Sequence, residues 1–169
     1  MTVYVALLRA VNVGGRQLKM DELKRIAADL GYDSPRTYVA SGNLLFDSDD
    51  KEVAVKRSLE RALARHMGSA DVMVRTAAEM AAVVKANPFA DEPGNRVVAI
   101  FFDQPPPADA AESAKNVVDE RLALGRREIY VHFPSGQGRS KLRLAGKVPG
   151  TARNMNTVAR LAELAMEKA

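Results

Sequence analysis

Residues 20–46 read MDELKRIAADLGYDSPRTYVASGNLLF, and this stretch decides the fold. Its apolar residues recur three and four positions apart from Met20 to Leu30, which predicts an amphipathic helix that ends at Gly31. Two short strand-like runs follow at 37–40 and 44–46, and the Ser-Gly-Asn sequence between them suits a hairpin turn or a bulge. One helix followed by a hairpin indicates a mixed α and β fold.

The segments on either side complete the element order βαββαβ. A short β-type run at 3–8 precedes the helix, and an apolar stripe at 55–63 predicts a second helix that ends near Gly68. Residues 72–74 then return as a strand. This order is that of the ferredoxin-like arrangement, in which two helices cover one face of an antiparallel sheet.

Capping-box spacing marks three helix starts, because an N-cap residue and a Glu three positions later can satisfy each other's free backbone N–H groups. The pairs are Asp49 with Glu52, Thr76 with Glu79, and Asp109 with Glu112. The second pair predicts a helix that stops at Asn87, since Pro88 disfavours helical geometry at the residue before it. The third pair predicts a helix over 109–118.

A second α and β half follows a boundary near 87–95. Its further elements are strand-like runs at 96–103 and 129–133 and a helical stripe at 155–165. We therefore expect an α+β protein of two ferredoxin-like βαββαβ-type halves, at 1–87 and 96–169, related by internal duplication and packed together.

Composition excludes several classes of protein. A chain of 169 residues that is 47% hydrophobic and 27% charged has enough apolar surface to fold as a globular protein. It has no cysteine, which excludes disulfides, thiol catalysis and thiolate metal sites, and with only His66 and His132 no metal centre is expected. No apolar run approaches the roughly 18 residues needed to cross a bilayer, and no signal-type segment is present, so we expect a cytoplasmic protein without a membrane partner.

Basic side chains gather in one part of the sequence. Residues 121–153 hold eight basic residues and one acidic residue, Glu128, while the remainder is mildly acidic. Such asymmetry is expected of a face that meets phosphate, carboxylate or nucleic acid. It is equally expected of arginines that serve only the solubility of the surface.

Two polar clusters in the first half are candidates for ligand binding. One surrounds Gly14 and Gly15, between a strand end and a helix start, where free backbone N–H groups and the positive end of the helix favour an anion. Turn geometry alone also explains these glycines. The other is the turn at 41–43, which fits a hairpin better than a serine nucleophile because no histidine is a local partner.

A third polar cluster covers 134–141 and 150–157. Thr151 or Asn154 can cap the last helix, which leaves Arg153 and Asn156 beside an N-terminus that attracts anions. A purely structural role is equally compatible, with Arg153 paired to an internal carboxylate. Across the three clusters, the candidate ligand-binding residues are Arg9, Asn12, Gly14, Gly15, Lys19, Ser41, Asn43, Arg153, Asn154 and Asn156.

These patterns identify neither a cofactor nor a catalytic residue. The Gly-Gly loop matches neither G-x-G-x-x-G nor G-x-x-x-x-G-K-[ST], so no nucleotide cofactor is expected. His132 lies on a predicted strand within the basic stretch and is a candidate general base, although the sequence defines no partner for it.

Several segments together resemble a known bacterial family. They are YVALLRAVNVGG at 4–15, Lys19-Met20 with Leu23, Arg36-Thr-Tyr38, Ser41-Gly-Asn43, Asn87-Pro-Phe89 and TARNMNT at 151–157. The sequence resembles the group catalogued as domain of unknown function 1697, and the resemblance implies a duplicated α+β fold without an established activity. Relatives commonly have Trp where Met155 stands, and we favour a packing role for this position.

Three functions are compatible with these observations. We favour a binding protein or unassigned enzyme that recognises a small anionic or phosphorylated ligand at a polar surface formed by the Gly-Gly loop and the start of the last helix. The first alternative is a nucleic-acid-binding module, although aromatic residues make up only 5% of the chain. The second is a structural or partner-binding protein without catalysis.

Overall fold

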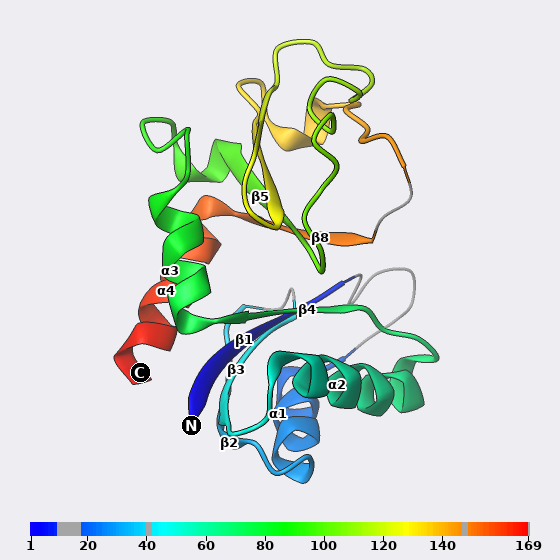
Figure 1. Cartoon of the computed structure of the whole chain (residues 1–169), viewed down its shortest axis with the longest axis vertical. Coiled ribbons are helices and arrows are strands. Elements are labelled where there is room, and N and C mark those ends of the chain that lie inside the picture. Colours follow the sequence, from blue (N-terminus) through cyan, green and yellow to red (C-terminus); the bar gives the residue numbers. More distant parts are fainter. Residues whose placement is uncertain (10–17, 40–41, 147–148, 169) are drawn as a thin grey trace. The chain divides into compact units, whose positions relative to one another are not determined.

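The computed structural model describes residues 1–9, 18–39, 42–146 and 149–168 (Figure 1). It contains two compact units, which we call the first unit (Met1–Ala81 and Leu161–Ala169) and the second unit (Ala82–Arg160). The chain passes between them within two helices, α3 (Ala77–Lys85) and α4 (Met155–Lys168). The division into halves at 1–87 and 96–169 stays a prediction.

The first unit has the element order βαββαβ. Its elements are β1 (Thr2–Leu8), α1 (Met20–Asp29), β2 (Asp33–Thr37), β3 (Asn43–Ser48), α2 (Glu52–Met67) and β4 (Val72–Thr76). The strands form one antiparallel sheet in the order β2-β3-β1-β4. Both helices lie against the same face of this sheet (Figure 1).

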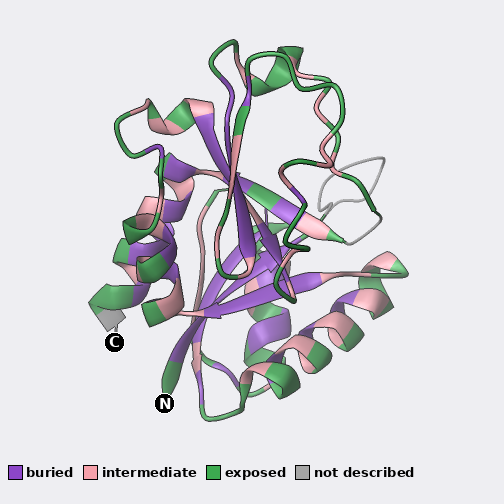
Figure 2. Ribbon diagram, turned by 45° about the horizontal axis from the view of Figure 1, so that its top comes forward, coloured by how far each residue is buried: buried purple, intermediate pink, exposed green. Residues whose placement is uncertain are grey.

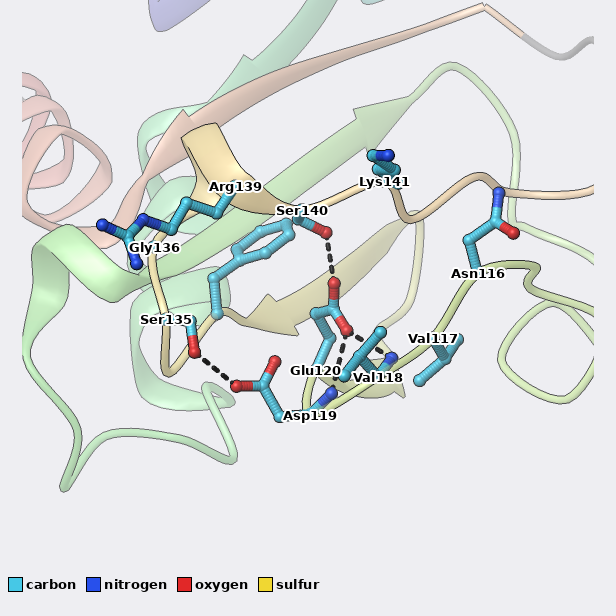
Figure 3. Close-up of a pocket in the computed structure, with 11 residues that line it drawn as sticks. Asn116, Val117, Val118, Asp119, Glu120, Ser135, Gly136, Arg139, Ser140 and Lys141 are labelled. Carbon is cyan, nitrogen blue, oxygen red and sulfur yellow. Dashed lines mark hydrogen bonds between the residues drawn. The ribbon is translucent and has the colours of Figure 1, made fainter.

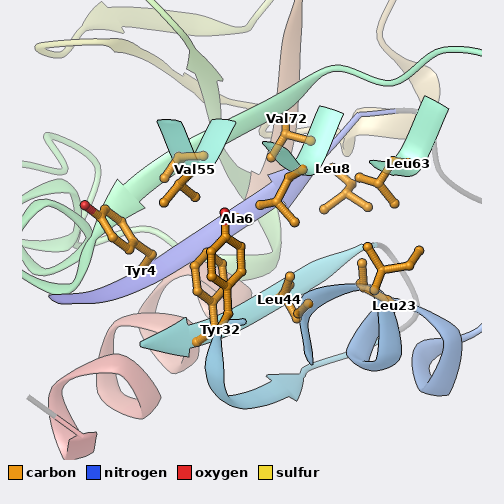
Figure 4. Close-up of a cluster of buried hydrophobic side chains, with 14 of the residues drawn as sticks. Tyr4, Ala6, Leu8, Leu23, Tyr32, Leu44, Val55, Leu63 and Val72 are labelled. Carbon is orange, nitrogen blue, oxygen red and sulfur yellow. The ribbon is translucent and has the colours of Figure 1, made fainter. Parts of the chain in front are cut away.

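The core of the first unit lies between this sheet and its two helices (Figure 4). Alternate strand residues point into it because side chains on a strand alternate between the two faces. The ring of Tyr32 stacks on that of Phe46, with centroids 4.4 Å apart and an interplanar angle of 10°. From the helices, Leu23, Val55 and Leu63 complete the cluster, and each buried side chain of this size contributes roughly 1.5–3 kcal/mol.

The second unit repeats this strand order without α-helices between its strands, as far as its described residues show. Its strands are β5 (Val97–Phe102), β6 (Arg121–Leu124), β7 (Glu128–His132) and β8 (Gly150–Asn154). They form an antiparallel sheet in the order β6-β7-β5-β8, which is again second, third, first and fourth. Two short 3-10 turns, η1 (Gly94–Arg96) and η2 (Gln137–Arg139), precede β5 and follow β7.

The prediction of a helix over 109–118 is wrong, and the backbone contacts of this segment explain why. The N–H of Ser113 donates to the carbonyl of Asp109, so a single turn forms. The backbone of Lys115 then pairs with that of Arg143, and Asn116 adopts a positive φ of 61°, which no α-helix accommodates. Residues 109–118 therefore form turns and an isolated bridge instead of a helix.

The three capping-box predictions have different outcomes. Thr76 and Glu79 form the predicted box at the start of α3, with side-chain to backbone distances of 3.1 and 2.9 Å. The box predicted at Asp49 is wrong, because α2 begins after Lys51 and has no side-chain cap. The box predicted at Asp109 is wrong because no helix follows it.

Burial follows the two sheets, and exposed positions lie mainly on the outer sides of helices and on turns (Figure 2). Met155 is buried, which agrees with the packing role favoured for it. Within the described part of the chain, no helix is both long enough and apolar enough to span a membrane.

Candidate functional site

The predicted Gly-Gly loop is described only at its two ends. Asn12, Gly14 and Gly15, and likewise Ser41, lie outside the described residues. At one end, the guanidinium Nη1 of Arg9 lies 3.5 Å from a carboxylate oxygen of Asp71, and the two side chains are 47% and 45% exposed.

At the other end of the loop, Lys19 occupies the N-cap position of α1. Its side chain is exposed and forms no ion pair with any described residue. The N-terminus of α1 has no side-chain cap, so backbone N–H groups of its first turn are left without a partner from the N-cap side chain. The positive end of the helix dipole lies at this N-terminus, and such an end favours an anion.

Asn43 closes the β2–β3 hairpin and is fully buried. Its side-chain amide donates to the carbonyl of Tyr38 at 2.9 Å, and the N–H of Tyr38 donates to the carbonyl of Asn43 at 3.1 Å. Gly42 has a φ of +83°, which glycine adopts at no steric cost. These contacts fit the structural interpretation of the turn.

The junction of β8 and α4 carries the other predicted residues. Arg153 is 7% exposed, and its Nη1 donates to the hydroxyl of Thr151 at 2.6 Å and to the carbonyl of Ala152 at 2.9 Å. Burial lowers the pKa of its guanidinium to about 10, which still leaves the group charged at neutral pH. Arg153 therefore belongs to the body of the unit rather than to its surface.

Asn154 is the N-cap of α4, as predicted, because its side-chain oxygen accepts the N–H of Thr157 at 2.9 Å. Asn156 is exposed and packs against Gly94, where an added Cβ would lie only 2.1 Å from the Asn156 side-chain oxygen. Arg153, Asn154 and Asn156 belong to the second unit, and Arg9, Lys19 and Asn43 belong to the first.

The second unit also contains a pocket of about 460 Å³. Figure 3 shows Arg139, Ser140 and Lys141 along one wall and Val117, Val118 and Asp119 along the other. Its lining residues are Asn116, Val117, Val118, Asp119, Glu120, Phe133, Ser135, Gly136, Arg139, Ser140 and Lys141. One wall thus belongs to the polar stretch 134–141. No pattern in the sequence predicted that residues 116–120 would form the other wall.

Glu120 organises the pocket (Figure 3). Its carboxylate accepts hydrogen bonds from the hydroxyl of Ser140 and from the N–H groups of Val118 and Asp119, the latter two at 2.7 and 3.1 Å. The bond from Ser140, followed by that from Val118, holds the pKa of this carboxyl at about 2. The charged carboxylate therefore ties the two walls together.

His132 is buried and has a partner at each ring nitrogen. Its Nδ1 lies 3.0 Å from a guanidinium nitrogen of Arg121, and its Nε2 lies 3.2 Å from a carboxylate oxygen of Glu92. Because Arg121 can only donate, Nδ1 accepts and the neutral ring carries its proton on Nε2, facing Glu92. The guanidinium of Arg121 also lies 5.0 Å from the centre of the Phe89 ring.

This arrangement leaves His132 without a ring nitrogen for a substrate, although a general base must reach the proton that it removes. Glu92 is the partner that sequence reasoning missed, because 40 residues separate it from His132 and no local pattern links them. In the described ranges, no group of three His, Asp or Glu side chains is arranged to hold a metal ion.

Comparison with known families decides where the chain belongs. The model of the family described as protein of unknown function, DUF1697, matches residues 1–130. The chain is a member of the DUF1697 family. A comparison with curated proteins gives no match for this DUF1697 protein.

A solved structure is similar over almost the whole chain. The protein is similar to the conserved bacterial protein SP0830 from Streptococcus pneumoniae, with 26% sequence identity and a TM-score of 0.79. The similarity covers 97% of this chain and 98% of that one. This DUF1697 protein therefore belongs to an uncharacterised conserved bacterial family, and its function has to come from the chemistry of its own residues.

Proposed function

We propose that this DUF1697 protein binds a small anionic or phosphorylated ligand at the polar surface formed by the Gly-Gly loop and the start of the last helix. The observation that carries the proposal is the N-terminus of α1, which has no side-chain cap and begins beside the exposed cation Lys19. A helix start without a side-chain cap and beside a cation favours a phosphate or carboxylate through hydrogen bonds and charge together.

Arg9 supports the same proposal from the other end of the loop. Its ion pair with Asp71 is exposed and spans 3.5 Å, and a pair of this kind contributes at most about 1 kcal/mol. A ligand phosphate can therefore compete with Asp71 for the guanidinium of Arg9. In the second unit, we propose that Asn156 contributes its amide and Arg153 its positive charge at the start of α4.

Isothermal titration calorimetry with inorganic phosphate, glucose 6-phosphate and adenosine monophosphate tests the proposal. We expect at least one of them to bind, and the double variant Arg9→Gln, Lys19→Gln to weaken that binding at least about tenfold, since charged hydrogen bonds are worth about 1.5–3 kcal/mol. Asn156→Ala is expected to weaken it as well.

Lys51→Gln is the matched control, because Lys51 is also an exposed N-cap residue of a helix without a side-chain cap. It should leave the affinity unchanged. The proposal fails when none of the three compounds binds, or when the control weakens binding as much as the double variant.

The nucleic-acid alternative has less support. All five phenylalanines and three of the four tyrosines are buried, so they offer no stacking platform for bases. We expect no shift of single-stranded RNA in electrophoresis at low salt. A shift that disappears as salt rises would favour this alternative instead.

We also propose that the two units arose by duplication of a ferredoxin-like unit. Support comes from their common strand order, second, third, first and fourth, in two antiparallel sheets. On this proposal, the segment at 103–120 replaced a helix that covered the ancestral sheet.

A further inference from the structure

We propose that the pocket of the second unit is a separate binding site, which takes an anion joined to a compact apolar group. Its volume of about 460 Å³ falls within the range of roughly 300–1,000 Å³ that is usual for small-molecule sites. The site shares no residue with the surface of the proposed function and stands independently of it.

The charges of the pocket favour an anion, although its lining contains two acids and two bases. Asp119 accepts a hydrogen bond of 2.6 Å from the hydroxyl of Ser135, and Glu120 is occupied by its three donors. Arg139 and Lys141 are exposed, and neither forms an ion pair with a described residue. An incoming ligand therefore finds cationic donors available and acidic acceptors already engaged.

The opposite wall, which contains Val117 and Val118, favours an apolar group of a ligand. Val117 is 44% exposed and Val118 is 89% exposed, although valine is usually among the most buried residues. Phe133, buried to 6% exposure, adds a further apolar surface to the lining. A ligand group that covers these valines gains hydrophobic free energy that inorganic phosphate does not gain.

The walls are held in place before any ligand arrives. Ser140 binds Glu120 across the pocket, and the carbonyl of Pro134 accepts a hydrogen bond of 2.8 Å from Arg96. The backbones of Lys115 and Arg143 pair just outside the lining residues, with distances of 2.8 and 3.0 Å. A site ordered in this way loses little conformational entropy on binding.

Titrations of the full chain with phenyl phosphate, inorganic phosphate and phenol test the inference. We expect phenyl phosphate to bind at least about tenfold more tightly than inorganic phosphate, and phenol to bind more weakly than phenyl phosphate because it lacks the anion. Methyl resonances of Val117 and Val118 should shift on addition of phenyl phosphate, which locates the ligand in this pocket.

Two sets of variants separate the charge from the apolar wall. Arg139→Gln with Lys141→Gln should weaken phenyl phosphate binding at least about tenfold, whereas Arg126→Gln, an exposed arginine outside the lining, should not. Val118→Thr should reduce the advantage of phenyl phosphate over inorganic phosphate. Val53→Thr, an exposed valine on α2, is its control.

Circular dichroism and thermal melting establish that each variant is folded. The inference is overturned when phenyl phosphate does not bind, when its binding survives Arg139→Gln with Lys141→Gln in a folded protein, or when the two valines do not shift. A phenyl phosphate affinity that is lost only in the Arg9→Gln, Lys19→Gln variant would support the proposed function and reject this second site.

Discussion

The hydroxyl of Tyr130 is buried within the second unit and donates a hydrogen bond of 2.7 Å to the carbonyl of Val83. It links strand β7 to helix α3 by a buried hydrogen bond. A buried hydroxyl of this kind stabilises the fold only while it keeps both its proton and its acceptor. Burial, assisted by the charge of Glu128, raises the pKa of Tyr130 to about 12.

We expect Tyr130→Phe to lower the free energy of unfolding by about 1 kcal/mol at neutral pH, measured by urea denaturation. The raised pKa adds a pH dependence. The folded state keeps the phenol proton above the ordinary pKa of 10.0, where the unfolded state loses it. The contribution of Tyr130 is therefore complete below pH 10.0 and is lost as the pH rises through about 12.

The difference in stability between the wild type and Tyr130→Phe should accordingly shrink over that alkaline range. Other groups that titrate there act in both proteins and cancel in the difference. A difference that stays constant with pH would contradict the assigned role of the buried hydroxyl.

At the scale of single elements, the start of α3 gives a direct test of local sequence patterns. Thr76→Ala removes the hydroxyl that accepts the N–H of Glu79, and loss of such a cap costs about 1 kcal/mol. Asp49→Ala is the comparison, since Asp49 has the same spacing to a Glu but caps no helix. We expect the thermal midpoint to fall clearly for Thr76→Ala and little for Asp49→Ala, and equal falls would contradict this interpretation.

Some elements were predictable from the sequence and others were not. Helices α1, α2 and α4 were predicted because each has an apolar stripe long enough to show its period. Strands β6 and β8 were missed because they are short and partly exposed, and pairing with β7 and β5 makes them strands. The helix predicted at 109–118 was lost to a backbone pairing with Arg143 that no local pattern reveals.

The candidate sites were predictable to the same limited extent. The stretch 134–141 was recognised as polar and glycine-rich, and it forms one wall of the pocket. The wall at 116–120 was hidden because its valines resemble core residues and Glu120 acts through a tertiary bond to Ser140. Glu92 and Arg121 were missed for the same reason, since only the folded chain brings them to His132.

On the scale of the whole molecule, the last nine residues, Leu161–Ala169, belong to the unit formed by the first 81. Leu161 is fully buried, and the carbonyl of Leu164 accepts a hydrogen bond of 3.4 Å from Arg36 on β2. The end of α4 is therefore part of the first unit rather than an appendage of the second.

We expect Leu161→Ala to destabilise the protein by about 2–5 kcal/mol, because it removes a buried side chain and leaves a cavity. Met166→Ala on the same helix, at a side chain that is 51% exposed, should change stability by less than about 0.5 kcal/mol. Chemical denaturation of both variants measures the difference. Similar small effects would show that the end of α4 contributes little to the first unit.

Because helix α4 is divided between the two units, the units are completed in a fixed order during synthesis on the ribosome. Residues 82–160 leave the ribosome as one uninterrupted piece, whereas the unit around them has to wait for residues 161–169. The unit that begins first is thus completed last, because Leu161–Ala169 are made after the whole of Ala82–Arg160.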